Sequence, residues 1–214
     1  MKDTILQTSL SQFLKYGIRE MSIQKLIEPM GISTKTVYKY FKNKEDLLEA
    51  ALRLHYSQQY QLLEELSEDQ QVIPLFVSVW YEAFEVEHSV TSIFFHDLGY
   101  YYPGLENKIQ KENGTRFNRK FIQIIQRGIE EGLFRDDIEP KVIMESIYVL
   151  YEAVIRTERF KTYKATPHNL LLNTVIIYIR GFCTSKGMKE LNTQVANFQP
   201  IGKILKSKNK IENV

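Results

Sequence analysis

Apolar residues recur at helical spacing along most of the chain, and no segment alternates between apolar and polar residues as a half-buried strand does. The first such segment covers residues 2–16 and is followed by Gly17, which is typical of a helix C-cap. Further helices are expected at residues 22–28, 34–40, 44–66, 72–87, 89–101, 104–131, 140–159 and 167–184. The pattern therefore predicts an all-α fold of about nine helices.

Residues 22–41 have the layout of a helix-turn-helix. Ser22 is a plausible N-cap for the first helix of this pair, and Pro29 should end that helix because proline does not fit a helix interior. Gly31 supplies the turn, and Ser33 caps the second helix. In a motif of this kind the second helix lies in the major groove of DNA. Just beyond it, Asn43 and Asp46 resemble a capping pair for the next helix.

The second helix of this motif is surrounded by positive charge, with four lysines and no acidic residue between Met30 and Lys44. Hydroxyl and ammonium groups are suited to phosphate contacts, and the N-terminus of the helix usually enters the groove deepest. We therefore assign Thr34, Lys35 and Thr36 to base edges, beside the cap Ser33. The residues expected to contact phosphates are Tyr38, Lys39, Tyr40, Lys42 and Lys44. The alternatives are a solvated basic face and, for Tyr38 and Tyr40, a partly buried position.

In these residues the chain resembles the DNA-binding domain of the TetR family of bacterial transcription regulators. The matching positions are Phe13, Gly17, Gly31, Ser33, Thr36, Tyr38, Tyr40, Phe41, Lys44, Glu45, Leu47 and Leu48. The chain departs from the family pattern at Ile27, Pro29 and Lys35. The resemblance implies an all-helical homodimer with a variable C-terminal domain that senses a small ligand.

This interpretation divides the chain into three parts. Residues 1–50 are expected to form the DNA-binding domain, residues 51–187 a ligand-binding and dimerisation domain, and residues 188–214 a basic tail or an extra helix. The boundary should fall inside the helix 44–66, near residues 53–56, so that a rigid helix joins the two domains.

Aromatic residues are dense between Phe76 and Tyr102, and two interpretations compete. Most of these side chains are expected in the core. The alternative is a ligand pocket with a few polar groups that orient an apolar molecule. Its candidate residues are Trp80, Phe84, His88, Phe95, Phe117 and Phe121.

Residues 167–184 leave almost no polar face, so a single helix there must be buried on all sides. A second chain would supply that burial, with two helices from each copy forming a four-helix interface. The candidate interface residues are Ile143, Ile147, Tyr151, Val154, Leu171, Val175, Ile179 and Phe182. The alternative is a monomer with this helix in its core.

The composition and the residue types argue against several other classes of protein. The net charge of the 214 residues is only +2, so attraction to nucleic acid depends on where the lysines lie. Cys183 is the only cysteine, which suits a reducing cytoplasm, and neither a signal peptide nor a membrane span is expected. The four histidines do not have the spacing of metal ligands, and we expect no cofactor and no catalytic set of residues.

The function predicted from the sequence is that of a DNA-binding transcriptional regulator. We expect a repressor that binds a near-palindromic double-stranded operator as a homodimer and is released by a small, largely apolar effector. The alternative is a dimeric small-molecule-binding protein that no longer recognises specific DNA. An enzyme is the third possibility.

Overall fold

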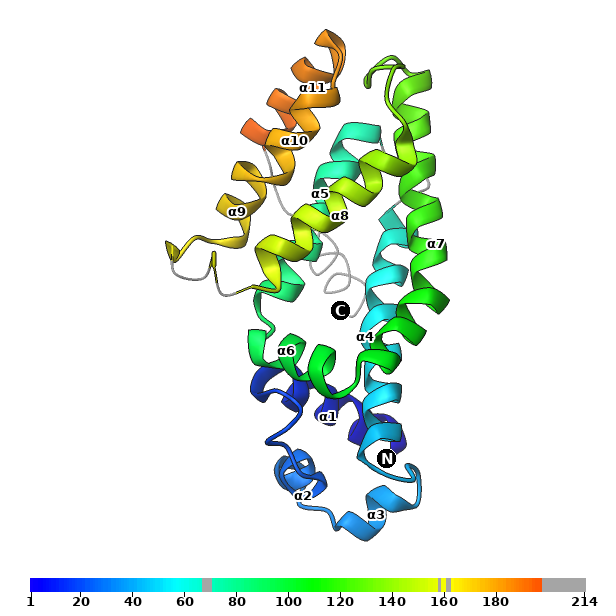
Figure 1. Ribbon diagram of the computed structural model, residues 1–214, viewed down its shortest axis with the longest axis vertical. Coiled ribbons are helices and arrows are strands. Elements are labelled where there is room, and N and C mark those ends of the chain that lie inside the picture. The colour runs from blue at the N-terminus through cyan, green and yellow to red at the C-terminus, as the bar shows by residue number, and fades with distance from the viewer. Residues whose placement is uncertain (67–70, 158, 161–162, 198–214) are drawn as a thin grey trace, which may run out of the picture. The chain divides into compact units, whose positions relative to one another are not determined.

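The computed structural model describes residues 1–66, 71–157, 159–160 and 163–197. Within these ranges the chain is helical, and the only β-type pairing is an isolated antiparallel bridge between Phe134 and Cys183. The elements, drawn in Figure 1, are α1 Lys2–Tyr16, α2 Ile23–Ile27, η1 Glu28–Met30, α3 Thr34–Tyr38, α4 Lys44–Leu66, α5 Val72–His88, α6 Ser92–Tyr101, α7 Pro103–Glu130, α8 Pro140–Ile155, α9 Pro167–Asn173, α10 Val175–Phe182 and α11 Ser185–Ala196. The predicted all-α fold is confirmed, with more helices than the nine expected.

The helices pack as two compact units. Unit 1 comprises Met1–Leu62 with Ser89–Phe117, and unit 2 comprises Leu63–His88 with Asn118 onward. Helix α6 and the first half of α7 thus pack with the N-terminal helices. The units divide the chain differently from the sequence-based boundaries at residues 50 and 187. The helix predicted at residues 44–66 is continuous.

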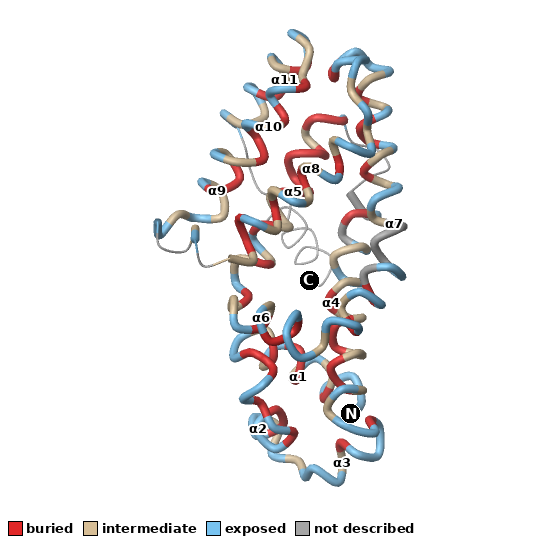
Figure 2. Tube along the Cα trace, viewed as in Figure 1, coloured by how far each residue is buried: buried red, intermediate tan, exposed pale blue. Residues whose placement is uncertain are grey.

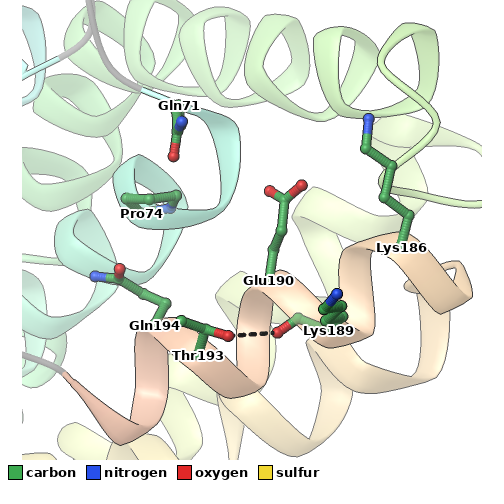
Figure 3. A pocket seen from close by; sticks show the side chains of 7 residues that line it. All are labelled: Gln71, Pro74, Lys186, Lys189, Glu190, Thr193 and Gln194. Atoms are coloured by element: carbon green, nitrogen blue, oxygen red, sulfur yellow. Dashed lines mark hydrogen bonds between the residues drawn. The ribbon is translucent and has the colours of Figure 1, made fainter.

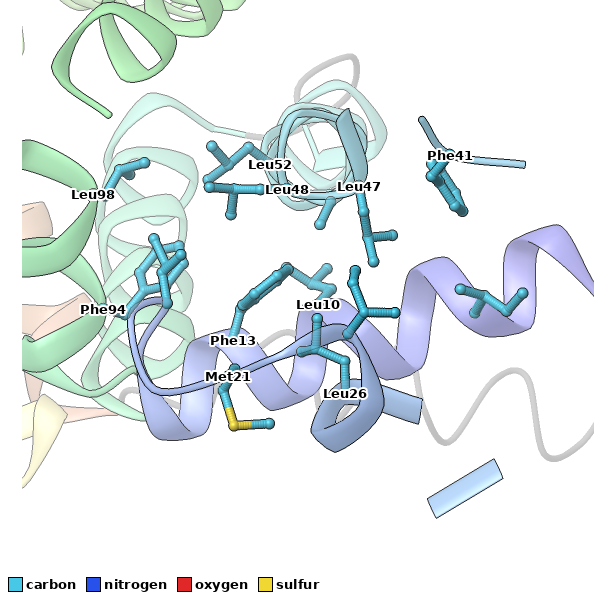
Figure 4. Close-up of a cluster of buried hydrophobic side chains, with 14 of the residues drawn as sticks. Leu10, Phe13, Met21, Leu26, Phe41, Leu47, Leu48, Leu52, Phe94 and Leu98 are labelled. Atoms are coloured by element: carbon cyan, nitrogen blue, oxygen red, sulfur yellow. The ribbon is translucent and has the colours of Figure 1, made fainter. Parts of the chain in front are cut away.

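Unit 1 has a core to which α1, α2, α4 and α6 all contribute. Figure 4 shows side chains of these helices pointing toward one another around Phe13, which is fully buried. The members labelled there are Leu10, Phe13, Met21, Leu26, Phe41, Leu47, Leu48, Leu52, Phe94 and Leu98. Most of them come from the segments in which helical spacing predicted an inward face, because that spacing reports burial directly. Burial of these apolar side chains is the main term that stabilises the unit.

Unit 2 is built around α5, which packs against α8, α9 and α11. The ring of Phe76 on α5 is fully buried and lies 5.8 Å from that of Phe121, 6.0 Å from Phe134 and 6.5 Å from Phe182, measured between centroids. These edge-to-face contacts are the preferred geometry of aromatic pairs. The central helix of this unit is therefore α5, and not the helix predicted at residues 167–184.

The segment 167–184 is not one helix. It breaks at Thr174, whose backbone leaves the helical region with φ −129° and ψ −88° and whose hydroxyl donates to the carbonyl of Leu170 at 2.6 Å. Within α9 the buried residues are Leu170 and Leu171, and within α10 they are Val175, Ile176, Ile179 and Phe182, while Ile177 is 58% exposed. This explains why the sequence looked apolar on all sides, and it removes the need to bury one helix all round.

The last described helix, α11, begins at Ser185, three residues before the segment 188–214 that we assigned to a tail or an extra helix. Thr184 caps it by accepting a hydrogen bond from the backbone N–H of Gly187 at 3.1 Å. Residues 188–196 are therefore helical. The basic part of the segment, with Lys203, Lys206, Lys208 and Lys210, lies outside the described residues.

Candidate nucleic-acid interface

The helix-turn-helix forms because each of its ends has a local cap. The hydroxyl of Ser22 accepts a hydrogen bond from the backbone N–H of Lys25 at 3.2 Å at the start of α2. The Pro29 segment forms the short 3-10 helix η1, and Gly31 then adopts the left-handed conformation with φ 62°. Ser33 accepts from the backbone N–H of Thr36 at 3.3 Å and starts α3. These are the caps and the turn that the sequence predicted.

Helix α3 is anchored on one side only. Val37 is fully buried and Phe41 is 3% exposed, so both face the core of unit 1. The opposite side is open to solvent, as Figure 2 shows, and Tyr38 and Tyr40 are 54% and 42% exposed. The alternative that these tyrosines are partly core is therefore excluded. The exposed candidates for DNA contact are Ser33, Thr34, Lys35, Tyr38, Lys39, Tyr40 and Lys42, while Thr36 is half-buried and shares a 3.1 Å hydrogen bond with the Ser33 hydroxyl.

The start of α4 closes the motif through the capping pair predicted from the sequence. The side-chain carbonyl of Asn43 accepts from the backbone N–H of Asp46 at 2.8 Å. In return, the Asp46 carboxylate accepts from the backbone N–H of Lys42 at 2.9 Å. This reciprocal pairing fixes the chain between α3 and α4. The basic residues of α3 are thereby held on a rigid base.

Lys44 differs from the other lysines because its ammonium group points back into the protein. It donates hydrogen bonds to the carbonyl oxygen of Ile18 and, at 3.4 Å, to that of Arg19. Burial lowers the pKa of Lys44, and the negative charges of Asp97 and Glu20 act in the opposite direction. Lys44 therefore ties α4 to the loop between α1 and α2, a contact that its position in the sequence did not reveal.

Three of the six candidate pocket residues meet in unit 2. The rings of Trp80 and Phe121 are 5.2 Å apart, and Tyr151 lies 5.5 Å from Trp80 and 5.3 Å from Phe84. Trp80, Phe84 and Phe121 are all at least 98% buried. This group of four rings is called the aromatic cluster below.

The other three candidates are not part of this cluster. Phe95 belongs to unit 1, where its ring packs 5.5 Å from that of Phe94. Phe117 is half-buried and belongs to unit 1 as well, and His88 is half-buried at the end of α5. Aromatic residues that lie close in the sequence are thus divided between the two units and do not all line one site.

The cavities with described linings lie elsewhere. One, of about 380 Å³, lies in unit 2 between Pro74 of α5 and the polar side of α11 (Figure 3). It is lined by Gln71, Pro74, Lys186, Lys189, Glu190, Thr193 and Gln194. A second, of about 470 Å³, lies in unit 1 between α1 and α4 and reaches Ser89. The polar lining of the first does not match the apolar ligand expected from the sequence.

The residues predicted for a dimer interface are mostly buried inside a single chain. Ile147, Tyr151, Val154, Leu171, Val175, Ile179 and Phe182 are each 5% exposed or less, and Ile143 is half-buried. Helical spacing identified an apolar face but not the surface that it packs against. The exposed apolar side chains of these helices are instead Val142 and Val149 on α8 and Ile177 on α10, at 58–60%.

Asp97 is a buried charged residue that the sequence patterns did not reveal. Asp97 is 4% exposed and accepts backbone hydrogen bonds from Ile18 and Arg19. The signal was a carboxylate among the apolar positions of residues 92–101, because a buried carboxylate requires donors.

No described helix combines the length and apolar character needed to cross a bilayer. Among the residues with described positions, no three His, Cys, Asp or Glu side chains come together as metal ligands would.

An all-α chain whose first helices present a basic, hydroxyl-bearing recognition helix on a rigid core is a helix-turn-helix DNA-binding protein. Residues 5–51 match the family described as bacterial regulatory proteins, tetR family. The match covers the helix-turn-helix together with α1 and the start of α4, so this part of the chain is a DNA-binding domain of the tetR type.

Similar proteins extend over most of the chain. The HTH-type transcriptional repressor KstR2 of Rhodococcus jostii is 21% identical over 139 residues, which is 63% of this chain and 68% of that protein. The structure of the ketosteroid transcriptional regulator KstR2 of Mycobacterium tuberculosis superposes with a TM-score of 0.62 at 17% identity, over 86% of this chain and 95% of the other. The fatty acid degradation regulator FadR of Bacillus halodurans gives a TM-score of 0.68 at 18% identity, over 84% and 95%.

Proposed function

We propose that the protein is a transcriptional repressor that binds a near-palindromic operator as a homodimer and leaves it when a small apolar effector binds. The observation that carries this proposal is the exposed side of α3. It combines lysine, threonine and tyrosine side chains on a helix that buried Val37 and the cap of Ser33 hold in place, and the Asn43 cap starts the helix that follows. Similarity to repressors of the same family supports the direction of regulation.

The roles on α3 follow from depth in the groove. We assign Thr34, Lys35 and Thr36 to base edges, since they lie in the first turn of α3. Tyr38, Lys39, Tyr40 and Lys42 follow them and are exposed, so we assign them to phosphates. Lys44 is assigned to holding the loop of Ile18 and Arg19. Two copies of α3 would enter successive major grooves about 34–36 Å apart.

The second copy is expected on the exposed apolar faces of α8 and α10. Val142 and Val149 lie seven residues apart on one side of α8, and Ile177 is exposed on α10. Exposed apolar stripes of this kind typically mark an interface, and two helices from each chain would form a four-helix bundle. The residues of the interface thus change from those predicted by the sequence, while the two helical segments stay the same.

Val149→Glu is expected to convert the dimer to a monomer, because it would place two carboxylates in an apolar interface. Tyr100→Glu is the matched control, since Tyr100 is a 71% exposed residue of unit 1 outside the stripe. The molecular mass in solution, measured by sedimentation or light scattering, separates the two variants. If both variants and the parent chain have the same mass, this interface is wrong.

The effector is expected among the rings of the aromatic cluster. Trp80, Phe84 and Phe121 offer an apolar surface, and the indole N–H of Trp80 is buried without a hydrogen-bond partner in the described part of the chain. A ligand that inserts between the rings and carries an oxygen atom would satisfy this donor. The names of the similar regulators refer to ketosteroids and to fatty acid degradation, which are chemistries of large apolar carbon skeletons.

Three measurements test the proposal. Selection from fragmented genomic DNA, followed by protection footprinting, should yield a two-fold symmetric site. Titration with a steroid ketone and with a long-chain acyl compound should then release the DNA. Trp80 is the only tryptophan, so its emission should change over the same concentration range. Absence of any protected site would refute DNA recognition and favour the small-molecule-binding alternative. Release without a change in emission would place the effector elsewhere.

A further inference from the structure

The loop between α1 and α2 is held by a carboxylate from α6. Both backbone N–H groups of the Ile18–Arg19 dipeptide donate to Oδ2 of Asp97, at 2.8 and 2.7 Å. Asp97 lies 79 and 78 positions further along the chain and is only 4% exposed. Hydrogen bonds to a charged acceptor are the strong ones, and at a buried site they are not replaced by water without cost.

The same dipeptide is held from its carbonyl side by α4. The ammonium of Lys44, the first residue of α4, donates to the carbonyls of Ile18 and Arg19. Two residues of loop thus connect an anion on α6 with a cation on α4. We call Asp97, the Ile18–Arg19 dipeptide and Lys44 the loop clasp.

Two further contacts hold α6 against the end of α1. The backbone N–H of Thr91, the N-cap of α6, donates to the carbonyl of Leu14 at 2.9 Å. Gly17 has a φ of +83°, and a Cβ atom there would come within 2.7 Å of Ile93 and 3.0 Å of Asp97. The end of α1 and the first turns of α6 therefore approach so closely that only glycine fits between them.

We propose that Asp97 is a positioning residue for DNA recognition, acting through the loop clasp. The dipeptide leads directly from α1 into the helix-turn-helix, and Lys44 starts the helix that follows it. The carboxylate therefore fixes the orientation of the helix-turn-helix relative to α6. This inference rests on the proposed function, because it assigns a residue to the geometry of operator binding.

Removal of the carboxylate should affect specific and non-specific DNA binding differently. Operator binding requires both α3 helices at a defined spacing, whereas phosphate contacts do not require the helix-turn-helix to be held in one orientation. Asp97→Ala should weaken operator binding on the order of ten- to a hundredfold, as expected for hydrogen bonds to a charged group. Binding to random duplex of the same length should change about twofold or less. The variant should also accept operators whose half-site spacing is altered by one base pair, because the orientation of each helix-turn-helix relative to α6 is less fixed.

The experiment compares the full-length parent chain with Asp97→Ala, Asp97→Asn and the control Asp3→Asn, which removes an exposed carboxylate from the first turn of α1. Asp97→Asn keeps one oxygen acceptor and should lie between the parent and the alanine variant, which guards against loss of folding in the latter. Far-UV circular dichroism establishes that each variant is folded before binding is measured.

Two results would overturn the positioning role. Equal losses on operator and random DNA would mean that Asp97 only stabilises the fold, and unchanged operator affinity with unchanged spacing preference would mean that the clasp does not act on recognition. If the parent chain itself does not distinguish operator from random DNA, the proposed function fails and the positioning role fails with it. Discrimination retained by the parent chain and by Asp97→Ala alike overturns only the role of Asp97.

Discussion

The sharpest test of the interface is the salt dependence of DNA binding after Lys39→Ala. Lys39 is the C-cap residue of α3, and its side chain is exposed. It is assigned to a phosphate, so its removal should weaken binding to operator and to random duplex by the same factor. Phosphate contacts carry no sequence information, which is why the two DNAs should respond alike.

The magnitude follows from the number of contacts in a dimer. Each phosphate neutralised by a lysine contributes a slope of about −0.9 to log K against log salt concentration. One substitution in a homodimer removes two contacts, so the slope should become shallower by about 1.8. If Lys39 and Lys42 are the phosphate lysines of each chain, the two residues together account for a slope of about −3.6.

Fluorescence anisotropy with a labelled duplex, at salt concentrations between about 50 and 200 mM, gives these slopes. Lys39→Arg should keep the parent slope because it keeps the charge. Lys189→Ala on α11 removes an equal charge from unit 2 and is the matched control.

Each outcome has a distinct meaning. A slope change near 0.9 would show that only one copy of α3 engages the duplex, which would contradict the dimer. No change in slope would refute the assignment of Lys39 to a phosphate. A change confined to the operator would mean that Lys39 contacts bases instead.

Two further predictions concern stability. Gly17→Ala should destabilise unit 1 by about 2 kcal/mol or more, because alanine is strained at a positive φ and its Cβ would clash with Ile93. Gly31→Asn is the control and should be nearly neutral, since asparagine tolerates the φ of +62° there and nothing lies within 4 Å of the added Cβ. Similar urea midpoints for the two variants would contradict this. Phe121→Ala should cost about 3–5 kcal/mol through the cavity left beside Phe76 and Trp80. Tyr100→Ala on an exposed position should stay within about 0.5 kcal/mol, and an equally small effect at Phe121 in urea unfolding would contradict its place in the core.

The sequence by itself determined the features that depend on near neighbours. The caps at Ser22, Ser33 and Asn43, the turn at Gly31 and the inward face of α1 all follow from residues at most four positions apart. The same local signals predicted the helix-turn-helix, and the exposed side of α3 carries the residues expected there.

Only the tertiary structure decided which surfaces meet. Helical spacing marked Ile147, Val154 and Val175 as buried, but it did not distinguish burial in the chain's own core from burial against a second chain. The break at Thr174 divides the segment that looked apolar on all sides into two shorter helices. Asp97 and Lys44 reach the same dipeptide from positions 79 and 26 residues away from Ile18. Contacts between residues so far apart in the chain cannot be read from local spacing. They form because the packed helices bring these groups together at a buried site, where a hydrogen bond is stronger than in water.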